Sequence, residues 1–406
     1  MIILRFAWRN LWRNKRRTAV TMAAVSLNVA ILIASTGLME GMMVNFLSNA
    51  TNLIVGEGQI HVPKFLVDRS MYKSLIDPEE ILDRLKREGI PASARSYGFG
   101  LVAHETKSAG ALFWGIDPEV ERNVFDLAKN VLHGEFISSR AEGGIVLGKK
   151  LARSLSVSVG DEIVVVVQAA DGSLGNELYT VTGILKSAGD SIDRDTAILH
   201  RADFEALFVS GGRIHEIAIN SRGAIPLETL NTIASRAAPE AEVKTWRQLM
   251  PSLSDMVNLF DVSMWFFWMI FFLAAAMGVM NTMLMATFER IKEFGVLKAL
   301  GTTPWRIIGD VTAEAFVLAF VSTLTGILIG VPMAFYLQEV GLDLSVFASG
   351  DVTIAGVAFD PVWRAAVTPK SIYMPVVVMW LICLLASLYP AAIAARLDPV
   401  KAMVHV

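Results

Sequence analysis

The chain has 406 residues, of which 53% are hydrophobic and 18% are charged. These values lie between those of soluble and membrane proteins, so they indicate a membrane anchor that carries a substantial soluble domain. The net charge of −3 gives no indication of nucleic-acid binding, and the single cysteine, Cys383, excludes an internal disulfide. The six histidines are scattered, without a pair at helical ligand spacing, so we predict no metal site.

The first 17 residues form a basic segment that also contains aromatic residues. Its positive charges are Arg5, Arg9, Arg13, Lys15, Arg16 and Arg17, and no acidic residue lies among them. Phe6, Trp8 and Trp12 are interspersed with these charges. Aromatic side chains beside arginine and lysine are typical of a helix that lies at a membrane surface. We therefore predict an amphipathic helix over residues 1–17, along the inner leaflet.

Four stretches without charged residues are long enough to cross a bilayer as helices, which takes about 20 residues. They cover residues 18–39, 262–288, 315–338 and 371–395. We predict a first transmembrane helix with a stalk over 18–48, and three more over 257–288, 306–338 and 371–395. A signal peptide is the alternative for the first stretch, but its apolar run is too long and no convincing cleavage site follows it.

Lysine and arginine near the ends of the spans predict their orientation. These residues concentrate in segment 1–17, between the second and third spans, and in the tail 396–406. All three regions are therefore expected on the cytoplasmic side. Residues 49–256 and the loop 339–370 are expected outside the membrane.

Residues 49–256 have the patterns of an α+β domain with a β-rich middle. Apolar and polar residues alternate at 59–62, as in a strand, and several later segments between 101 and 244 also have the pattern of strands. Asp77, Pro78 and Glu80 form the sequence of a helix start with a capping box. The predicted fold class is therefore a four-helix transmembrane protein with a large extracytoplasmic α+β domain between helices 1 and 2.

No motif in the sequence supports catalysis. The sequence GGIVLGKK at 143–150 is close to a phosphate-binding loop, but Lys150 stands where a Ser or Thr should hold magnesium. Residues 145–147 also have the pattern of a strand inside what should be the loop. No nucleophile elbow or HExxH motif is present. We predict a chain without catalytic residues and without a cofactor of its own.

A short charged helix is predicted at 289–301, between the second and third spans. Its charged residues are Glu289, Arg290, Lys292, Glu293 and Lys298, and its apolar residues are Phe294, Val296, Leu297 and Leu300. Gly301 is the expected stop. A helix that displays both kinds of side chain can bind a soluble partner, and an ordinary polar loop is an equally good interpretation.

Two further patterns lie in or near the spans. Soft apolar side chains gather at the outer ends of the first two spans and suit a variable ligand such as an acyl chain, although for any single one of them we favour a lipid-facing or helix-packing role. They are Met39, Met42, Met43, Phe46, Met256, Phe260 and Met264. Gly326 and Gly330 form a GxxxG pair, for which we favour packing within the chain over a dimer contact. Asp261 and Glu314 lie at span ends, so a proton relay is not expected.

Three motifs resemble the permease subunits of one group of ABC transporters. They are AWRNLWRNKRRT at 7–18, ERIKEFGVLKALG at 289–301 and YPAAIAARLDPVKAM at 389–403. FWGIDPE at 113–119 and the segment 145–163 also resemble elements of this group. The group includes lipoprotein-releasing permeases, macrolide-exporter permeases and the cell-division permease.

This resemblance implies a dimer with a second permease copy or a paralogue, bound to two copies of a separate cytoplasmic ATPase that would hold ATP and magnesium. It implies a bacterial inner membrane location, a periplasmic core domain over 49–256 and a β-rich insertion at about 105–222. It also makes 289–301 a coupling helix in or beside a groove of the ATPase, with Phe294 and Leu297 filling a pocket. The implied contact residues are Glu289, Arg290, Glu293, Phe294, Gly295, Leu297, Lys298 and Gly301.

Three functions are compatible with the resemblance. Lipoprotein release toward a periplasmic carrier is favoured by the match of residues 40–63 and by the lack of a fused ATPase domain in the sequence. The alternatives are efflux of a peptide, antibiotic or lipid with a periplasmic adaptor, and mechanical control of a cell-wall hydrolase without transport.

Overall fold

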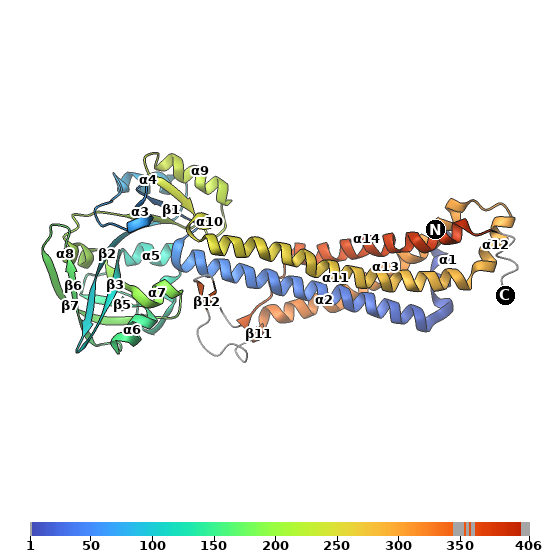
Figure 1. The fold of residues 1–406 in the computed structure, drawn as a ribbon, viewed down its shortest axis with the longest axis horizontal. Coiled ribbons are helices and arrows are strands. Elements are labelled where there is room, and N and C mark those ends of the chain that lie inside the picture. The colour runs from blue at the N-terminus through green and yellow to red at the C-terminus, as the bar shows by residue number, and fades with distance from the viewer. Residues whose placement is uncertain (1, 344–352, 355–356, 359–361, 399–406) are drawn as a thin grey trace. The chain divides into compact units, whose positions relative to one another are not determined.

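The computed structural model describes residues 2–343, 353–354, 357–358 and 362–398 (Figure 1). The chain divides into two compact units. We call Met1–Val44, Asn258–Val346 and Pro361–Val406 the membrane unit, and Asn45–Val257 with Phe347–Asp360 the sheet unit. The end of the predicted tail, from 399, lies outside the described residues, as do 344–352, 355–356 and 359–361 of the predicted outer loop.

The long helices agree with the predicted fold class. Four helical segments are long and apolar enough to cross a membrane, namely Arg5–Val55, Pro251–Glu289, Pro304–Glu339 and Pro369–Arg396. The helices that carry the membrane unit are α1 (Ile2–Leu11), α2 (Lys15–Ala50), α11 (Pro251–Glu289), α12 (Ile291–Ala299), α13 (Pro304–Glu339) and α14 (Pro369–Arg396). Both α2 and α11 contribute residues to each unit.

The glycine pair of α13 packs against α2 within the chain. A Cβ added at Gly326 would lie 2.6 Å from Cβ of Val29, and one at Gly330 would lie 2.8 Å from Cα of Ala30. The two helices therefore touch almost backbone to backbone, which small residues permit. This contact agrees with the interpretation that we favoured over a dimer contact.

A second pair of glycines, on α2, was not recognised from the sequence. The segment that leads into α14 crosses α2 at Gly37 and Gly41: the Ala366 N–H donates to the carbonyl of Gly37 at 2.8 Å, and Arg364 leaves no room for a side chain at Gly41. The Thr368 hydroxyl also donates to Glu40 at 3.0 Å. This connection therefore fastens the start of α14 to α2.

The sheet unit is built on one ten-stranded sheet. Its order is β10-β1-β9-β2-β3-β8-β5-β7-β4, and β6 pairs with β2 and β7. The strands are β1 (Gly58–His61), β2 (Ala92–His104), β3 (Lys107–Ile116), β4 (Val131–Gly134), β5 (Gly144–Leu147), β6 (Glu162–Gln168), β7 (Leu174–Leu185), β8 (Thr196–His200), β9 (Glu216–Ile219) and β10 (Glu242–Thr245). Outside this sheet, two-residue strands pair as β11 (Leu342–Asp343) with β14 (Val362–Trp363) in the membrane unit, and as β12 (Thr353–Ile354) with β13 (Val357–Ala358) in the sheet unit.

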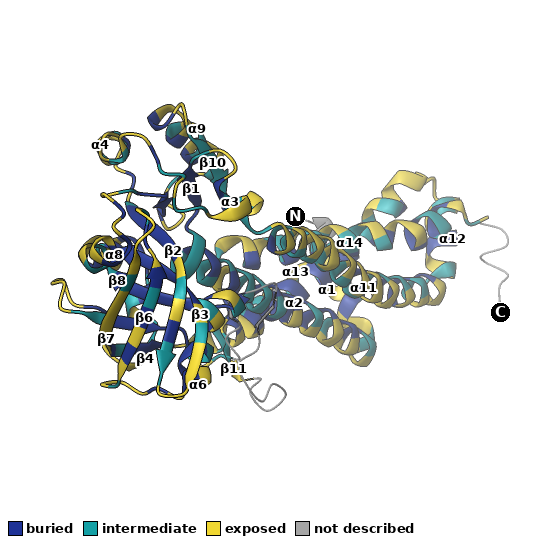
Figure 2. Cartoon of the chain, turned by 60° about the vertical axis from the view of Figure 1, so that its left-hand side comes forward, coloured by how far each residue is buried: buried dark blue, intermediate teal, exposed yellow. Residues whose placement is uncertain are grey.

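The sheet has separate hydrophobic cores, because successive side chains of a strand point to opposite faces. Phe113 of β3 belongs to one core with residues of α6 and α8, and the next residue, Trp114, belongs to another with Phe65 of α3. Burial changes along single strands, as Figure 2 shows for β2. The helices are α3 (Phe65–Asp68), α4 (Pro78–Arg87), α5 (Pro118–Val124), α6 (Lys149–Leu155), α7 (Asp190–Asp195), α8 (Arg201–Phe208), α9 (Leu227–Ala237) and α10 (Trp246–Leu249).

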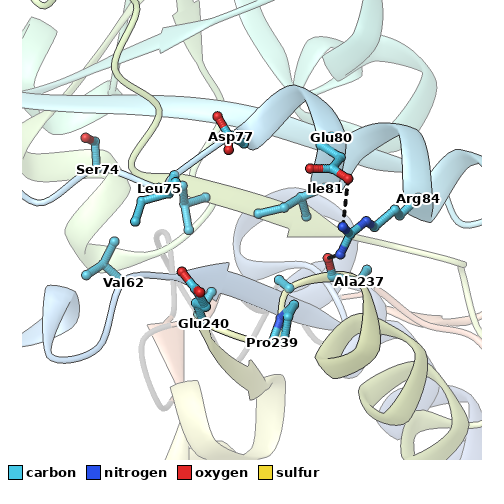
Figure 3. Close-up of a pocket in the computed structure, with 13 residues that line it drawn as sticks. Val62, Ser74, Leu75, Asp77, Glu80, Ile81, Arg84, Ala237, Pro239 and Glu240 are labelled. Atoms are coloured by element: carbon cyan, nitrogen blue, oxygen red, sulfur yellow. Dashed lines mark hydrogen bonds and ion pairs between the residues drawn. The ribbon is translucent and has the colours of Figure 1, made fainter.

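The predicted helix at Pro78 is present, but its predicted capping box is wrong. Asp77 has φ 47, in the left-handed region, and within the described part of the chain its side chain caps no backbone N–H. Glu80 instead pairs with Arg84 at 2.7 Å, beside a surface pocket of about 320 Å³ (Figure 3). The partner of Glu80 is thus a residue one turn later in the same helix, beyond the four-residue capping pattern.

A fully buried arginine holds the sheet to the end of the first long helix. Arg95 donates to Glu121 at 2.7 Å, to Glu216 at 3.4 Å and to the carbonyl of Ile54 at 2.8 Å. Ile54 belongs to the helical turn Thr51–Val55 that follows α2. The guanidinium carbon also lies 4.3 Å from the ring centroid of Phe125, a favourable cation–π position. The arginine therefore neutralises buried carboxylates and fastens this turn.

We predict that Arg95→Met lowers the free energy of unfolding by about 3–5 kcal/mol, because it leaves Glu121 and Glu216 buried without a counter-charge. The control is Arg194→Met, which removes an exposed pair with Asp190 worth about 0–1 kcal/mol. Thermal unfolding of both full-length variants in detergent measures the difference. Equal losses of stability in the two variants would contradict this account.

Candidate functional site

The charged segment between α11 and α13 folds as the short helix α12, Ile291–Ala299, at the same end of the membrane unit as α1 (Figure 1). Its predicted end at Gly301 is confirmed. Gly301 has φ +89, its N–H bonds to the carbonyl of Lys298, and the N–H of Thr302 bonds to the carbonyl of Leu297, both at 3.0 Å. This is a Schellman motif, in which glycine takes the left-handed position without strain.

A buried ionic contact holds the start of α12. Arg290 pairs with Glu314 of α13, whose side chain is only 6% exposed, and its Nε donates to Glu293 at 2.9 Å. Asn10 of α1 donates to the same oxygen of Glu314 at 2.7 Å. The guanidinium carbon of Arg290 also lies 5.0 Å from the ring centroid of Phe294. One carboxylate of α13 therefore holds both α1 and the beginning of α12.

Glu314 is the main residue of this site that was not predicted from the sequence. We expected the position at a span end to reduce the cost of a carboxylate, but the side chain is buried. A signal was available, because a carboxylate within an apolar helix needs a partner. The partners lie 24 and 304 positions away in the sequence. Their proximity could not be deduced from spacing.

Two arginines of the N-terminal segment add exposed contacts to the same cluster. Arg13 donates to Glu293 at 2.5 Å, and Arg17 donates to Glu289 at 2.9 Å. Burial alone would raise the pKa of Glu293, but the hydrogen bonds from Arg13 and Arg290 outweigh it and hold that pKa below its ordinary value of 4.5. The stabilisation by these bonds is therefore present above pH 4.5 and is lost as the pH falls through the lowered pKa.

The other end of α12 is fastened to α14. The Lys298 ammonium donates to the carbonyl of Ala395 at 2.9 Å and to that of Leu397 at 2.6 Å. Lysine commonly satisfies the last carbonyls of a helix in this way. Lys298 thus has a structural role in its own chain, in addition to any contact that the resemblance implies for it.

The expectation that Phe294 fills a pocket of a partner is wrong for this structure. Its side chain is 1% exposed and packs in the core of the membrane unit, and Gly295 beside it is also buried. The exposed residues of α12 and its C-cap are instead Lys292, Glu293, Val296, Leu297, Ala299 and Leu300, and four of them, Glu293, Val296, Leu297 and Leu300, form one row. These four residues follow the i, i+3, i+4, i+7 spacing of one helical face. Glu289 and Gly301 are also exposed, and Arg290 is half-buried.

The residues proposed for acyl-chain contact have different environments. Phe46 is buried against Ala50, Trp246 and Leu253 in the sheet unit, and Met256 packs against the same cluster. Phe46 is therefore a core residue and is not available to a ligand. The remaining residues of this set are half-buried on α2 or α11, namely Met39, Met42, Met43, Phe260 and Met264.

No set of three or more His, Cys, Asp or Glu residues within the described ranges could hold a metal ion. Cys383 is a buried residue of the membrane-unit core.

Two family models match the chain. The model of the MacB-like periplasmic core domain matches residues 18–250, and that of the FtsX-like permease C-terminal domain matches residues 265–399. An uncharacterized ABC transporter permease of Methanocaldococcus jannaschii is 20% identical, over 99% of this chain and 97% of its own length.

Two further relatives have more specific names. The lipoprotein-releasing system transmembrane protein LolC of Neisseria meningitidis serogroup B is 22% identical, over 95% of this chain and 93% of its own length. The macrolide export ATP-binding/permease protein MacB of Hyphomonas neptunium is 24% identical, over 98% of this chain and 60% of its own length.

We predict that Glu314→Gln destabilises the fold by about 1–3 kcal/mol, because a half-buried Arg290 loses the buried one of its two charged acceptors. Glu289→Gln is the matched control, since it removes an exposed pair worth about 0–1 kcal/mol. The measurements are thermal unfolding in detergent and the rate of proteolysis at α12. Faster cleavage at α12 in the control than in Glu314→Gln would refute the role assigned to Glu314.

Proposed function

This chain belongs to the family of ABC transporter permeases with a MacB-like periplasmic core domain and an FtsX-like permease C-terminal domain. On that basis we propose that it is the non-catalytic membrane subunit of a transporter that releases lipoproteins from the bacterial inner membrane toward the outer membrane. The observation that carries the proposal is α12: a helix between two spans, held by Arg290 and Lys298, that exposes an apolar face with Glu293 at one end.

In this proposal, α12 is the coupling helix and lies on the cytoplasmic side, together with both termini. The concentration of arginine and lysine in the N-terminal segment and around α12 supports this orientation. The sheet unit then lies in the periplasm. A separate ATPase, present in two copies, binds the ATP and magnesium and contacts α12 of each of two permeases, the second being another copy or a paralogue.

The fixation of α12 supports a mechanical role. A push on its exposed face would pass through Arg290 to α13 and α1, and through Lys298 to α14, because charged hydrogen bonds and packed helices resist separate movement. Since α2 and α11 contribute residues to both units, they are the elements that would carry the motion to the periplasmic side. The Arg95 contact with Ile54 would then pass the motion of α2 to the sheet.

Two candidate functions of this chain differ in the substrate: lipoprotein release, and export with a periplasmic adaptor. Lipoprotein release is supported by the relative named for it, which this chain matches over 93% of that relative's length, against 60% for the macrolide exporter. Export with a periplasmic adaptor is the second candidate, supported by the match to the MacB-like core domain model. A periplasmic carrier would receive the lipoprotein in the first case.

We predict that replacing Leu297 and Leu300 together by Asp weakens binding of the ATPase at least about 100-fold, because two apolar contacts at the centre of the interface become charged. The measurement is pulldown of the ATPase subunit of this transporter with the purified permease. The control replaces Val67 and Tyr72 by Asp, which are exposed apolar residues of the sheet unit. Undiminished binding by the Leu297 and Leu300 variant would overturn the assignment of α12.

We predict that Met43→Asp and Phe260→Asp each lower ATP-driven release of a triacylated lipoprotein at least tenfold, while basal ATPase activity is unchanged. A charge beside an acyl chain would be costly to bury. Proteoliposomes with a soluble lipoprotein carrier measure release, with Val67→Asp as control. Normal release by both variants would remove these residues from the substrate path.

Export of a macrolide without any lipoprotein release in the wild type would favour the second function.

A further inference from the structure

We propose that a groove between α13 and α14 binds an anionic phospholipid, with an acyl chain in the groove and the phosphate held by Arg306 and Arg396. The groove is separate from the residues proposed above for the lipoprotein. The proposal rests on the proposed function only in assigning this lipid to the inner leaflet.

The groove is an apolar hollow of about 540 Å³ on the surface of two candidate membrane spans. Small residues of α13 form one side: Gly309, Thr312 and Ala313. A Cβ added at Gly309 would meet no described atom within 4 Å. Phe316, Leu384, Leu385 and Leu388 complete the lining.

Among the described residues that line the groove, Thr312 carries the one hydroxyl, and this hydroxyl already has a hydrogen-bond partner within the chain. The Thr312 Oγ1 donates to the carbonyl of Ile308 at 2.8 Å, within its own helix. The remaining side chains that line the groove are apolar, so hydrocarbon fits the hollow and a polar group would lose its hydrogen bonds to water there. The shape and chemistry therefore select an alkyl chain.

Two arginines lie beyond the lining of the groove on the side of α12: Arg306 is three residues before Gly309, and Arg396 is eight residues after Leu388. Trp305 and Arg306 precede Gly309 by four and three residues, so they lie one turn away on the same side of α13. Arg396 is in the last turn of α14, and the bonds from Lys298 to Ala395 and Leu397 place that turn beside α12. Both arginines are exposed.

Exposed aromatic residues mark the same side as a membrane–water interface. Trp305 is 80% exposed and Tyr389, one residue after Leu388, is 59% exposed. Tryptophan and tyrosine are enriched at the level of lipid headgroups. Asp310 follows Gly309 but does not line the groove. A ligand with a hydrocarbon chain in the groove and an anionic headgroup beside Arg306 and Arg396 would therefore complement both the apolar lining and the positive charge.

Charge distinguishes an anionic phospholipid from a zwitterionic one. Each arginine near an anionic membrane surface strengthens binding about fivefold. Phosphatidylglycerol should therefore be preferred over phosphatidylcholine, and loss of either arginine should reduce that preference about fivefold. A transmembrane helix of a second copy is the competing occupant, but it would leave this cationic end without an anionic partner.

The test uses the full-length chain, purified in detergent without an ATPase, and photoreactive acyl-chain analogues of phosphatidylglycerol and phosphatidylcholine. Mass spectrometry should map labelling to residues 309–316 and 384–388, with phosphatidylglycerol preferred at least fivefold. Ala313→Trp should abolish labelling there, and Leu328→Trp, at an exposed position further along α13, should not. Gly309→Leu also fills the groove and replaces Ala313→Trp if that variant does not fold.

Arg306→Gln and Arg396→Gln should each lower the preference for phosphatidylglycerol about fivefold, whereas Arg16→Gln, which removes an exposed charge from α2, should leave it unchanged. Equal labelling by the two lipids, or labelling that survives Ala313→Trp and Gly309→Leu, would overturn the proposal. A disulfide between two copies through Thr312→Cys would also overturn it, in favour of a helix. Because no ATPase is present, these outcomes are independent of the pulldown with the Leu297 and Leu300 variant.

Discussion

The membrane unit depends on the buried contact between Arg290 and Glu314. A carboxylate taken out of water is costly unless a counter-charge and hydrogen bonds accompany it, so Glu314 requires both Arg290 and Asn10. These partners lie on different elements, and satisfying one charge therefore fixes the N-terminal helix, α12 and α13 together. Phe294 packs beneath the same guanidinium. The side of α12 that faces away from this contact is left to display Val296, Leu297 and Leu300.

The same physical principle operates in the sheet unit at the end of α2. Arg95 is surrounded by two carboxylates and an aromatic ring, and it also bonds the carbonyl of Ile54. At the beginning of α2, Arg17 pairs with Glu289. Each end of this long helix is thus tied by an arginine to the unit in which it lies. Glycines also allow close contacts along α2. The segment that leads into α14 crosses α2 at Gly37 and Gly41, and α13 packs against α2 at Gly326 and Gly330.

Features that depend on local sequence were predictable. Runs of apolar residues predicted four spanning helices, local apolar patterns predicted the strands of the sheet unit except β4 (Val131–Gly134), and Gly301 predicted the end of α12. Features that depend on distant partners were not. The role of Glu314 needed Asn10 and Arg290, the burial of Phe294 needed the packed spans, and Asp77 adopts a left-handed conformation in place of a cap. The close contact at Gly41 follows from the path of a segment more than 300 residues away.

The most direct test of the account is site-specific crosslinking from α12 in the assembled transporter. A photoreactive amino acid replaces Leu300, which is 78% exposed, or Val67 in the sheet unit as the control. The account predicts a crosslink from position 300 to the ATPase that changes in yield when ATP is added, and none from position 67. Absence of any ATPase crosslink from position 300 in an intact, active complex would contradict the assignment of α12 as the coupling helix.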